Sequence, residues 1–155
     1  MRLIICFFFL SSPLLLNAQE FEKAQNLYLK EKYIRYYDRS SGVLIQKIIN
    51  DSLQVRYELA LVIFSRGRES TDFLSLSSAI VFDDKSLIVF KDQIYINYFQ
   101  EGKCQYSVQH ILSNSELDQL KQKKIDYIVV ADRKKSLDRW QTEGFLKACD
   151  SIERQ

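Results

Sequence analysis

The longest alternation of hydrophobic and polar residues runs from residue 53 to residue 64. Its hydrophobic positions are Leu53, Val55, Tyr57, Leu59, Leu61 and Ile63, and in its first half they alternate with Gln54, Arg56 and Glu58. A repeat of two residues is typical of a β-strand that buries one face. In the second half the alternate positions are Ala60, Val62 and Phe64, so we expect that end to be covered on both faces. The pattern predicts a long strand at the centre of a sheet.

Shorter hydrophobic segments predict further strands, at residues 43–49, 73–82, 87–90, 94–99, 104–112 and 125–131. Polar turns at 83–86 and 100–103 join two pairs of these segments into hairpins. Consecutive hairpins favour an antiparallel sheet, because antiparallel neighbours need only a short connection.

Helical patterns dominate the last third of the chain. Ser113 and Glu116 have the spacing of a capping box, which predicts a short helix to about Lys123 with Leu117 and Leu120 facing inward. Ser136 is the predicted cap of a last helix over residues 137–152. The expected inward stripe of that helix is Leu137, Trp140, Gly144, Phe145, Ala148 and Ile152.

Residues 20–37 are less clear. They begin with helix formers, but a strand competes from residue 33 to residue 37, and the sequence leaves this boundary open. The other elements predict the α+β class, with an antiparallel sheet of about five to seven strands. The short helix and the C-terminal amphipathic helix are expected to pack on that sheet, and residues 19–155 have the size of one domain.

The first 18 residues have the pattern of a cleavable signal peptide. Arg2 is followed by an almost unbroken apolar run from Leu3 to Leu16, and Ala18 precedes the polar residues Gln19 and Glu20. The run is shorter than the roughly 20 residues of a membrane-spanning helix. The alternative is an uncleaved N-terminal anchor. We expect cleavage after Ala18, export to the periplasm or the medium, and no transmembrane span in the mature chain.

The charge balance argues against nucleic acid as a partner. The chain has 22 Lys and Arg against 20 Asp and Glu, and Arg2 leaves with the signal peptide, so the mature chain carries a net charge of +1. Such a chain has no long-range field to attract a polyanion. Residues 32–39, KYIRYYDR, interleave aromatic with basic residues, a pattern that can suit a glycan, but a tyrosine-rich packing surface is the favoured interpretation. The partner is left open, with an envelope protein or a glycan as the candidates.

The segment IVFDDKSLIVF, the Ser-capped helix SNSELDQLKQKKI, the strand after it and the closing amphipathic helix resemble a family of small exported α+β proteins common in Bacteroidetes. The resemblance covers the chain from about Tyr57 onward and rests on the order of elements. It implies the fold and export. It provides no catalytic residues, because that family has no established biochemical function.

Cys104 and Cys149 are the cysteines of the mature chain and form a candidate disulfide, since an even number in an exported protein permits one. The alternative is two buried thiols. His110 is the single histidine, and its place on the inward face of a strand indicates a structural role. One histidine and two separated cysteines match no ordinary zinc site.

Acidic and basic clusters also have structural interpretations. Asp83, Asp84 and Asp92 offer too few oxygens for calcium, which takes six to eight. The basic clusters at 121–124 and 133–135 are interpreted as solvated ends of elements. The sequence therefore predicts no catalytic, metal or cofactor residues. A non-catalytic exported binding module is the leading hypothesis; the alternatives are a carboxylate-dependent hydrolase and a structural subunit of an envelope assembly.

Export is directly testable. N-terminal sequencing of the protein recovered from the periplasm or medium is expected to begin at or near Gln19, because Ala18 ends the apolar segment. Recovery of the chain from the membrane with Met1 in place would contradict this prediction.

Overall fold

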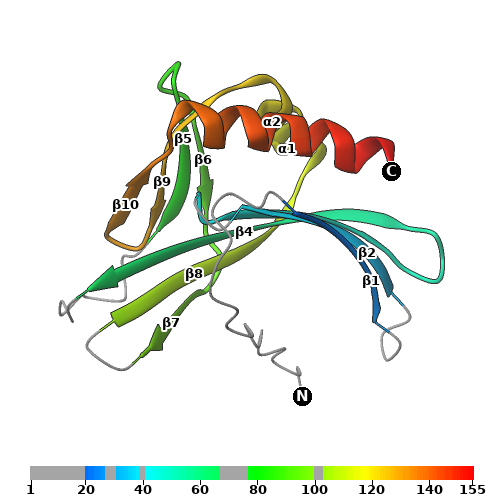
Figure 1. The fold of residues 1–155 in the computed structure, drawn as a ribbon, viewed down its shortest axis with the longest axis horizontal. Coiled ribbons are helices and arrows are strands. Elements are labelled where there is room, and N and C mark those ends of the chain that lie inside the picture. The colour runs from blue at the N-terminus through cyan, green and yellow to red at the C-terminus, as the bar shows by residue number, and fades with distance from the viewer. Residues whose placement is uncertain (1–19, 27–30, 39–40, 67–76, 100–102) are drawn as a thin grey trace.

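The computed structural model describes residues 20–26, 31–38, 41–66, 77–99 and 103–155, which form two antiparallel sheets and two helices (Figure 1). Sheet A has the strand order β1-β2-β3-β4-β8-β7, with bounds β1 Glu20–Asn26, β2 Glu31–Asp38, β3 Val43–Ile49, β4 Val55–Arg66, β7 Ile94–Tyr98 and β8 Lys103–Leu112. Sheet B has the order β10-β9-β5-β6, with bounds β5 Ser78–Phe82, β6 Leu87–Phe90, β9 Ile125–Val130 and β10 Arg133–Ser136. The helices are α1, Asn114–Gln122, and α2, Arg139–Arg154.

The α+β class and the antiparallel pairing are confirmed, but the single sheet is wrong. Strand β5 pairs with β6 and β9, and none of these joins β4. The hydrophobic pattern shows where a strand lies but not which strand it pairs with. Two sheets of six and four strands therefore give the same pattern along the sequence as one larger sheet. The expected signal peptide, residues 1–18, and the first part of the predicted strand 73–82 lie outside the described residues.

The sequence left the structure of residues 20–37 open between helix and strand, and the described residues there form strands. Strand β1 pairs with β2, and β2 continues the sheet onto β3. Tyr36 is buried and Ile34 is partly buried against the core, both on the face that carries Ile45 of β3. Sheet pairing and this burial outweigh a local helix preference of a few tenths of a kcal/mol per residue.

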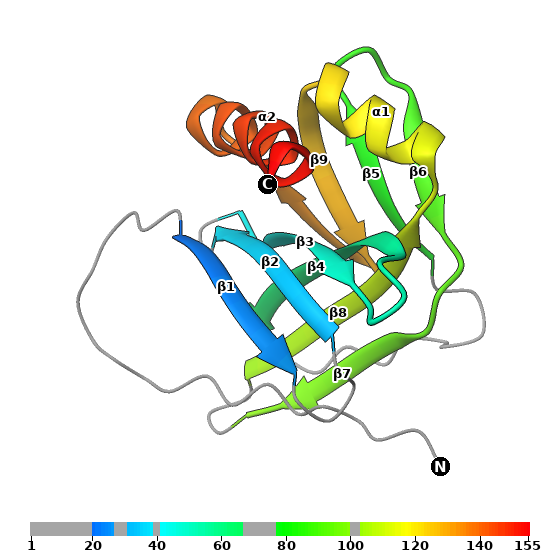
Figure 2. The same cartoon turned by 90° about the vertical axis from the view of Figure 1, so that its right-hand side faces the viewer.

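Helix α2 and sheet B cover one face of sheet A, which we call the first face (Figure 2). Helix α2 lies across β2 and β3, while β9 and β10 lie against β4. The buried side chains at these contacts include Val43, Ile45, Leu59, Leu61, Ile80, Ile128, Val130, Phe145, Ala148 and Ile152. Strand β4 lies between β3 and β8, so its central position is confirmed.

Glycine is required where β3 begins. Gly42 has φ +73°, and a Cβ atom there would lie 2.1 Å from the carbonyl oxygen of Val62. The close approach lets the Val62 N–H donate to the Gly42 carbonyl at 2.7 Å. Gly42 therefore holds the start of β3 against β4.

Both helices have capping boxes, and one differs from the prediction. Ser113 caps α1 as expected, with Leu117 and Leu120 buried. Helix α2 is capped by Asp138, whose carboxylate accepts from the Gln141 N–H at 2.8 Å, whereas Ser136 ends β10. No helix among the described residues is long and apolar enough to span a membrane.

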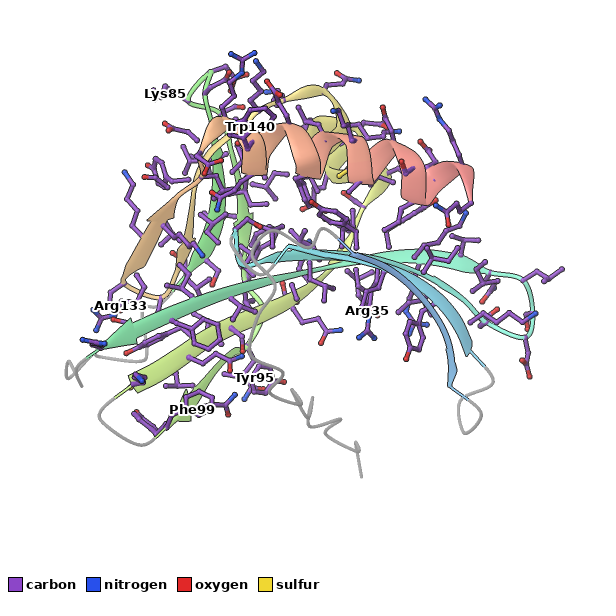
Figure 3. The ribbon with its side chains drawn as sticks, in the orientation of Figure 1. Arg35, Lys85, Tyr95, Phe99, Arg133 and Trp140 are labelled. Atoms are coloured by element: carbon purple, nitrogen blue, oxygen red, sulfur yellow. The ribbon has the colours of Figure 1, made fainter. Side chains whose placement is uncertain are left out.

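The expected inward position of Trp140 is wrong. Its side chain is 80% exposed and points away from sheet A (Figure 3). Trp140 precedes the buried Phe145 by five residues, which is about 140° around an α-helix. The rest of the predicted stripe within α2 is confirmed, because Gly144, Phe145, Ala148 and Ile152 are buried, together with Thr142 and Cys149. Trp140 fluorescence therefore does not report burial of the helix.

The burial of β4 predicts the cost of shortening its core side chains. Leu59→Ala and Leu61→Ala are each expected to lower the free energy of unfolding by about 2–5 kcal/mol, because both leucines are at most 1% exposed. Chemical denaturation measures this loss. Leu87→Ala, at an exposed position of β6, is the control and is expected to change it by less than about 0.5 kcal/mol. A small loss at both core positions would mean that the core lies elsewhere.

Candidate functional site

The face of sheet A opposite α2 and sheet B is the second face. Figures 1 and 2 show both helices and sheet B on the first face, and the sheet curving away from them. Strand register places alternate residues of β2, β3, β4, β8 and β7 on the second face: Tyr33, Arg35, Leu44, Gln46, Ile48, Arg56, Glu58, Ala60, Val62, Phe64, Arg66, Lys103, Gln105, Ser107, Gln109, Ile111, Tyr95 and Asn97.

The carboxylate of Glu58 lies at the centre of the second face and is buried, with 7% of the residue exposed. Oε2 accepts hydrogen bonds from the side-chain amides of Gln46 at 2.8 Å and Gln109 at 2.6 Å. Oε1 accepts from Nε of Arg56 at 2.9 Å. One carboxylate thus joins donors from β3, β4 and β8.

This network makes the centre of the second face rigid. Hydrogen bonds to an ionised group are about twice as strong as neutral ones, and both oxygens of Glu58 take part. A buried carboxylate without such partners would be strongly destabilising. Each glutamine donates its amide N–H to Glu58, so its amide oxygen is held in a fixed position beside the carboxylate. The network therefore orients hydrogen-bonding groups as well as satisfying a charge.

Arg35 extends the polar centre toward β1. It stands opposite Gln46 in the register of β2 and β3, and its guanidinium carbon lies 4.6 Å from the ring centre of Tyr33. That distance is within the range of a cation–π interaction. Figure 3 shows Arg35 on the side of sheet A away from α2.

Exposed aromatic and amide side chains gather at the β7 end of the second face. We define the amide–aromatic patch as Phe64, Tyr95, Asn97, Phe99 and Gln105. Phe64 and Asn97 both stand opposite Gln105, one on each side of β8. Phe99 follows β7, and its N–H donates to the Lys103 carbonyl, which continues the register. The exposed fractions of Phe64, Tyr95 and Phe99 are 59%, 47% and 50%.

The expectation that the far end of β4 is covered on both faces is therefore wrong. Ile63 faces the core and is buried, whereas its neighbour Phe64 faces outward. The cause is that α2 and sheet B lie on the first face, and the described residues place no element over Phe64 on the second. An apolar residue at an alternate position marks an exposed platform here, not a second core.

His110 joins three elements on the first face. Its Nδ1 lies 2.6 Å from the Asp92 carboxylate, and its Nε2 lies 3.3 Å from both carboxylate oxygens of Glu116 in α1. Its ring centre is 4.6 Å from that of Phe90. The sequence placed His110 on an inward face but missed both carboxylates, which lie 18 and 6 residues away.

Glu116 is already committed to the cap of α1. It accepts from the Ser113 N–H at 2.8 Å and from the Ser113 hydroxyl at 2.7 Å. Partial burial works against ionisation, but the hydrogen bonds from Ser113 and His110 outweigh it and lower the pKa of Glu116. Ser113 and Glu116 together form the capping box of α1, and His110 links that cap to Asp92. The cluster therefore ties β8, α1 and the turn after β6 together.

Cys104 and Cys149 are both buried thiols in the structure. Cys104 lies in β8 opposite Ser65 of β4, and Cys149 lies in α2, where burial raises the pKa of its thiol. A disulfide between them stays a prediction.

The acidic and basic clusters are engaged in local ion pairs. Lys123 bonds Asp84 at 2.8 Å, and hydrogen bonds from Lys123 and Ser86 lower the pKa of Asp84 to about 2. Lys121 bonds Asp118 and also Glu153, which ties α1 to α2. Asp92 is turned to His110 and not to Asp84. Within the described ranges, no group of three His, Cys, Asp or Glu residues is placed to hold a metal ion.

A shallow depression of about 200 Å³ lies at the start of α2, lined by Asp83, Lys124, Ile125, Asp126, Leu137, Asp138, Arg139, Thr142 and Glu143. Its charges are largely paired: Arg139 bonds Glu143 at 2.7 Å, and Asp126 accepts from Lys85 at 3.0 Å. Thr142 donates to the Ile125 carbonyl. These contacts serve the packing of α2.

Comparison with protein-family models, with curated proteins and with solved structures finds no match to the chain. Function must therefore be argued from the site. The second face is the strongest candidate, because it combines a buried hydrogen-bonded carboxylate with exposed aromatic and amide side chains.

The lowered pKa of Glu116 predicts a contribution to stability in acid. Because the folded state holds the carboxylate ionised below its ordinary pKa of 4.5, this stability is present at neutral pH and is lost as the pH falls through the lowered value. Glu116→Gln keeps a capping acceptor but cannot titrate. We expect it to cost about 1 kcal/mol at pH 7. The difference from wild type should shrink toward pH 3, as measured by urea denaturation. A difference independent of pH would contradict this role.

Proposed function

We propose that this protein is an exported, non-catalytic binding module that uses the second face of sheet A to hold an envelope or extracellular ligand. The single observation that carries the proposal is the amide–aromatic patch beside the Glu58 network. Three aromatic side chains that are about half exposed stand around two amide side chains on one face of one sheet. Aromatic residues are enriched in binding surfaces, where they supply contact area. The expected export supports a ligand outside the cytoplasm.

A hydrolase using carboxylates is less well supported. Glycoside hydrolysis needs two carboxyl groups roughly 5–10 Å apart across the bond. Among the side chains described on the second face, Glu58 is the only carboxylate, and three donors occupy its two oxygens. Its arrangement suits orientation of the two glutamines better than proton transfer.

One observation favours a structural subunit as the second candidate. Strands β6 and β7 are sheet edges without a charged residue, whereas the edges β1 and β10 carry several. Uncharged edges can add a strand from another chain, which natural proteins often prevent with charges. Leu87 and Val89 of β6 are also about half exposed. This candidate predicts assembly through the edges, whereas the leading one predicts binding through the second face.

The two candidates differ in a sedimentation assay with isolated envelopes of the organism that makes the protein. The double variant Phe64→Ala, Tyr95→Ala is expected to bind the envelopes with an affinity at least about tenfold lower, since each aromatic contact is worth roughly 0.5–1.5 kcal/mol. The affinity is obtained from the pelleted fraction. The matched control is Leu87→Ala, Val89→Ala, two exposed residues of β6. Binding that is lost in the control and kept in the patch variant would favour the edge. No binding by wild type would refute the proposal.

A further inference from the structure

We infer that the ligand of the amide–aromatic patch is a polysaccharide chain. This inference rests on the proposed function and adds the chemical class of the ligand. A pyranose ring has an apolar C–H face and a rim of hydroxyl groups. A site that recognises it therefore needs flat aromatic surfaces to contact the C–H face, and amide or carboxylate groups to hydrogen-bond the hydroxyl groups. The patch contains both kinds of group, and none of its five residues carries a charge.

The spacing of the aromatic residues suits a chain of sugars better than a single small molecule. Phe64 lies on β4, two strands away from the β7 segment that carries Tyr95 and Phe99. Along the strand direction, each of these residues is offset from Phe64 by two residues. With strands about 4.8 Å apart and about 3.3 Å per residue, each separation is about 12 Å. That is close to the length of a disaccharide unit. Stacking on two platforms thus leaves one sugar between them.

Amide groups occupy the space between the platforms. Asn97 and Gln105 stand opposite each other on β7 and β8, between Phe64 and the two aromatic residues of the β7 segment. Each amide offers two N–H donors and one carbonyl acceptor, which can bond adjacent hydroxyl groups of a sugar. Gln109 lies two residues after Ser107 in β8, on the same face. Its amide donates a hydrogen bond to Glu58 at 2.6 Å, and it extends the row of polar side chains. A sugar chain can follow it toward the centre of sheet A.

A polypeptide ligand would use different features. An extended peptide gains most of its affinity from main-chain hydrogen bonds to a sheet edge, with side-chain pockets for specificity. A peptide strand added to the edge of β7 would bind through the backbone of that edge, whereas the side chains of the patch stand on the face formed by β4, β8 and β7. An anionic polymer would need cations along its whole path. Lys103, opposite Phe99, and Arg66 flank one end of the patch, but Asn97 and Gln105 between its aromatic residues are uncharged.

The test treats the envelope pellet of the sedimentation assay before adding wild-type protein. Periodate cleaves the vicinal diols of sugars, and protease digestion removes protein. We expect periodate to abolish binding, and protease digestion and 0.5 M NaCl to leave at least half of it. Asn97→Ala and Gln105→Ala are expected to weaken binding to the untreated pellet about tenfold each. Leu87→Ala, at an exposed position of β6 outside the second face, is the control and is expected to bind within about twofold of wild type.

The outcomes separate this inference from the proposed function. Binding that survives periodate, or that is lost on protease digestion or in 0.5 M NaCl, overturns the polysaccharide and leaves a protein or an anion as the ligand of the same face. Absence of binding to the untreated pellet refutes the proposed function itself. Because all three substituted residues are on the surface, the fold of each variant can be verified by its unfolding curve.

Discussion

Strand β4 has two faces, and in the part of the chain that the structure describes the covering elements lie on one of them. Helix α2 and sheet B bury Leu59, Leu61 and Ile63 on the first face. The rest of the architecture depends on this one-sided burial. Sheet B must be separate from sheet A so that β9 and β10 can lie against β4, and α2 must follow β10 to reach β2 and β3. The hydrophobic contact across the first face is what stabilises both sheets.

The second face solves the opposite problem. A face that none of the described elements covers cannot be apolar throughout, and its centre is too sheltered to leave a charge without partners. Glu58 is a polar residue at the centre of this face. Its buried carboxylate has partners, because it accepts hydrogen bonds from Gln46, Gln109 and Arg56 across three strands. Replacing such a network with apolar side chains is often neutral or stabilising. The proposed function gives the network a second role, which is to hold the two glutamine side chains in fixed orientations.

The sequence predicted correctly the features that depend on a single strand or helix. The alternation around Leu59 identified β4, and Ser113 with Glu116 identified the cap of α1, because both signals are local. It was not informative where distant partners decide. Gln46, Glu58 and Gln109 meet only through the register of β3, β4 and β8, which no local pattern contains. Trp140 and Phe64 were interpreted as buried because they are apolar, and the side of a helix or sheet that is covered depends on the whole fold.

The most direct test of this account compares two adjacent residues of β4, one on each face. Ile63 is 5% exposed and Phe64 is 59% exposed. The free energies of unfolding of Ile63→Ala and Phe64→Ala, measured by chemical denaturation, separate burial from recognition. The account predicts a loss of about 2–5 kcal/mol for Ile63→Ala and less than about 1 kcal/mol for Phe64→Ala. A loss at Phe64 as large as that at Ile63 would show that the second face belongs to the core and is not a binding surface.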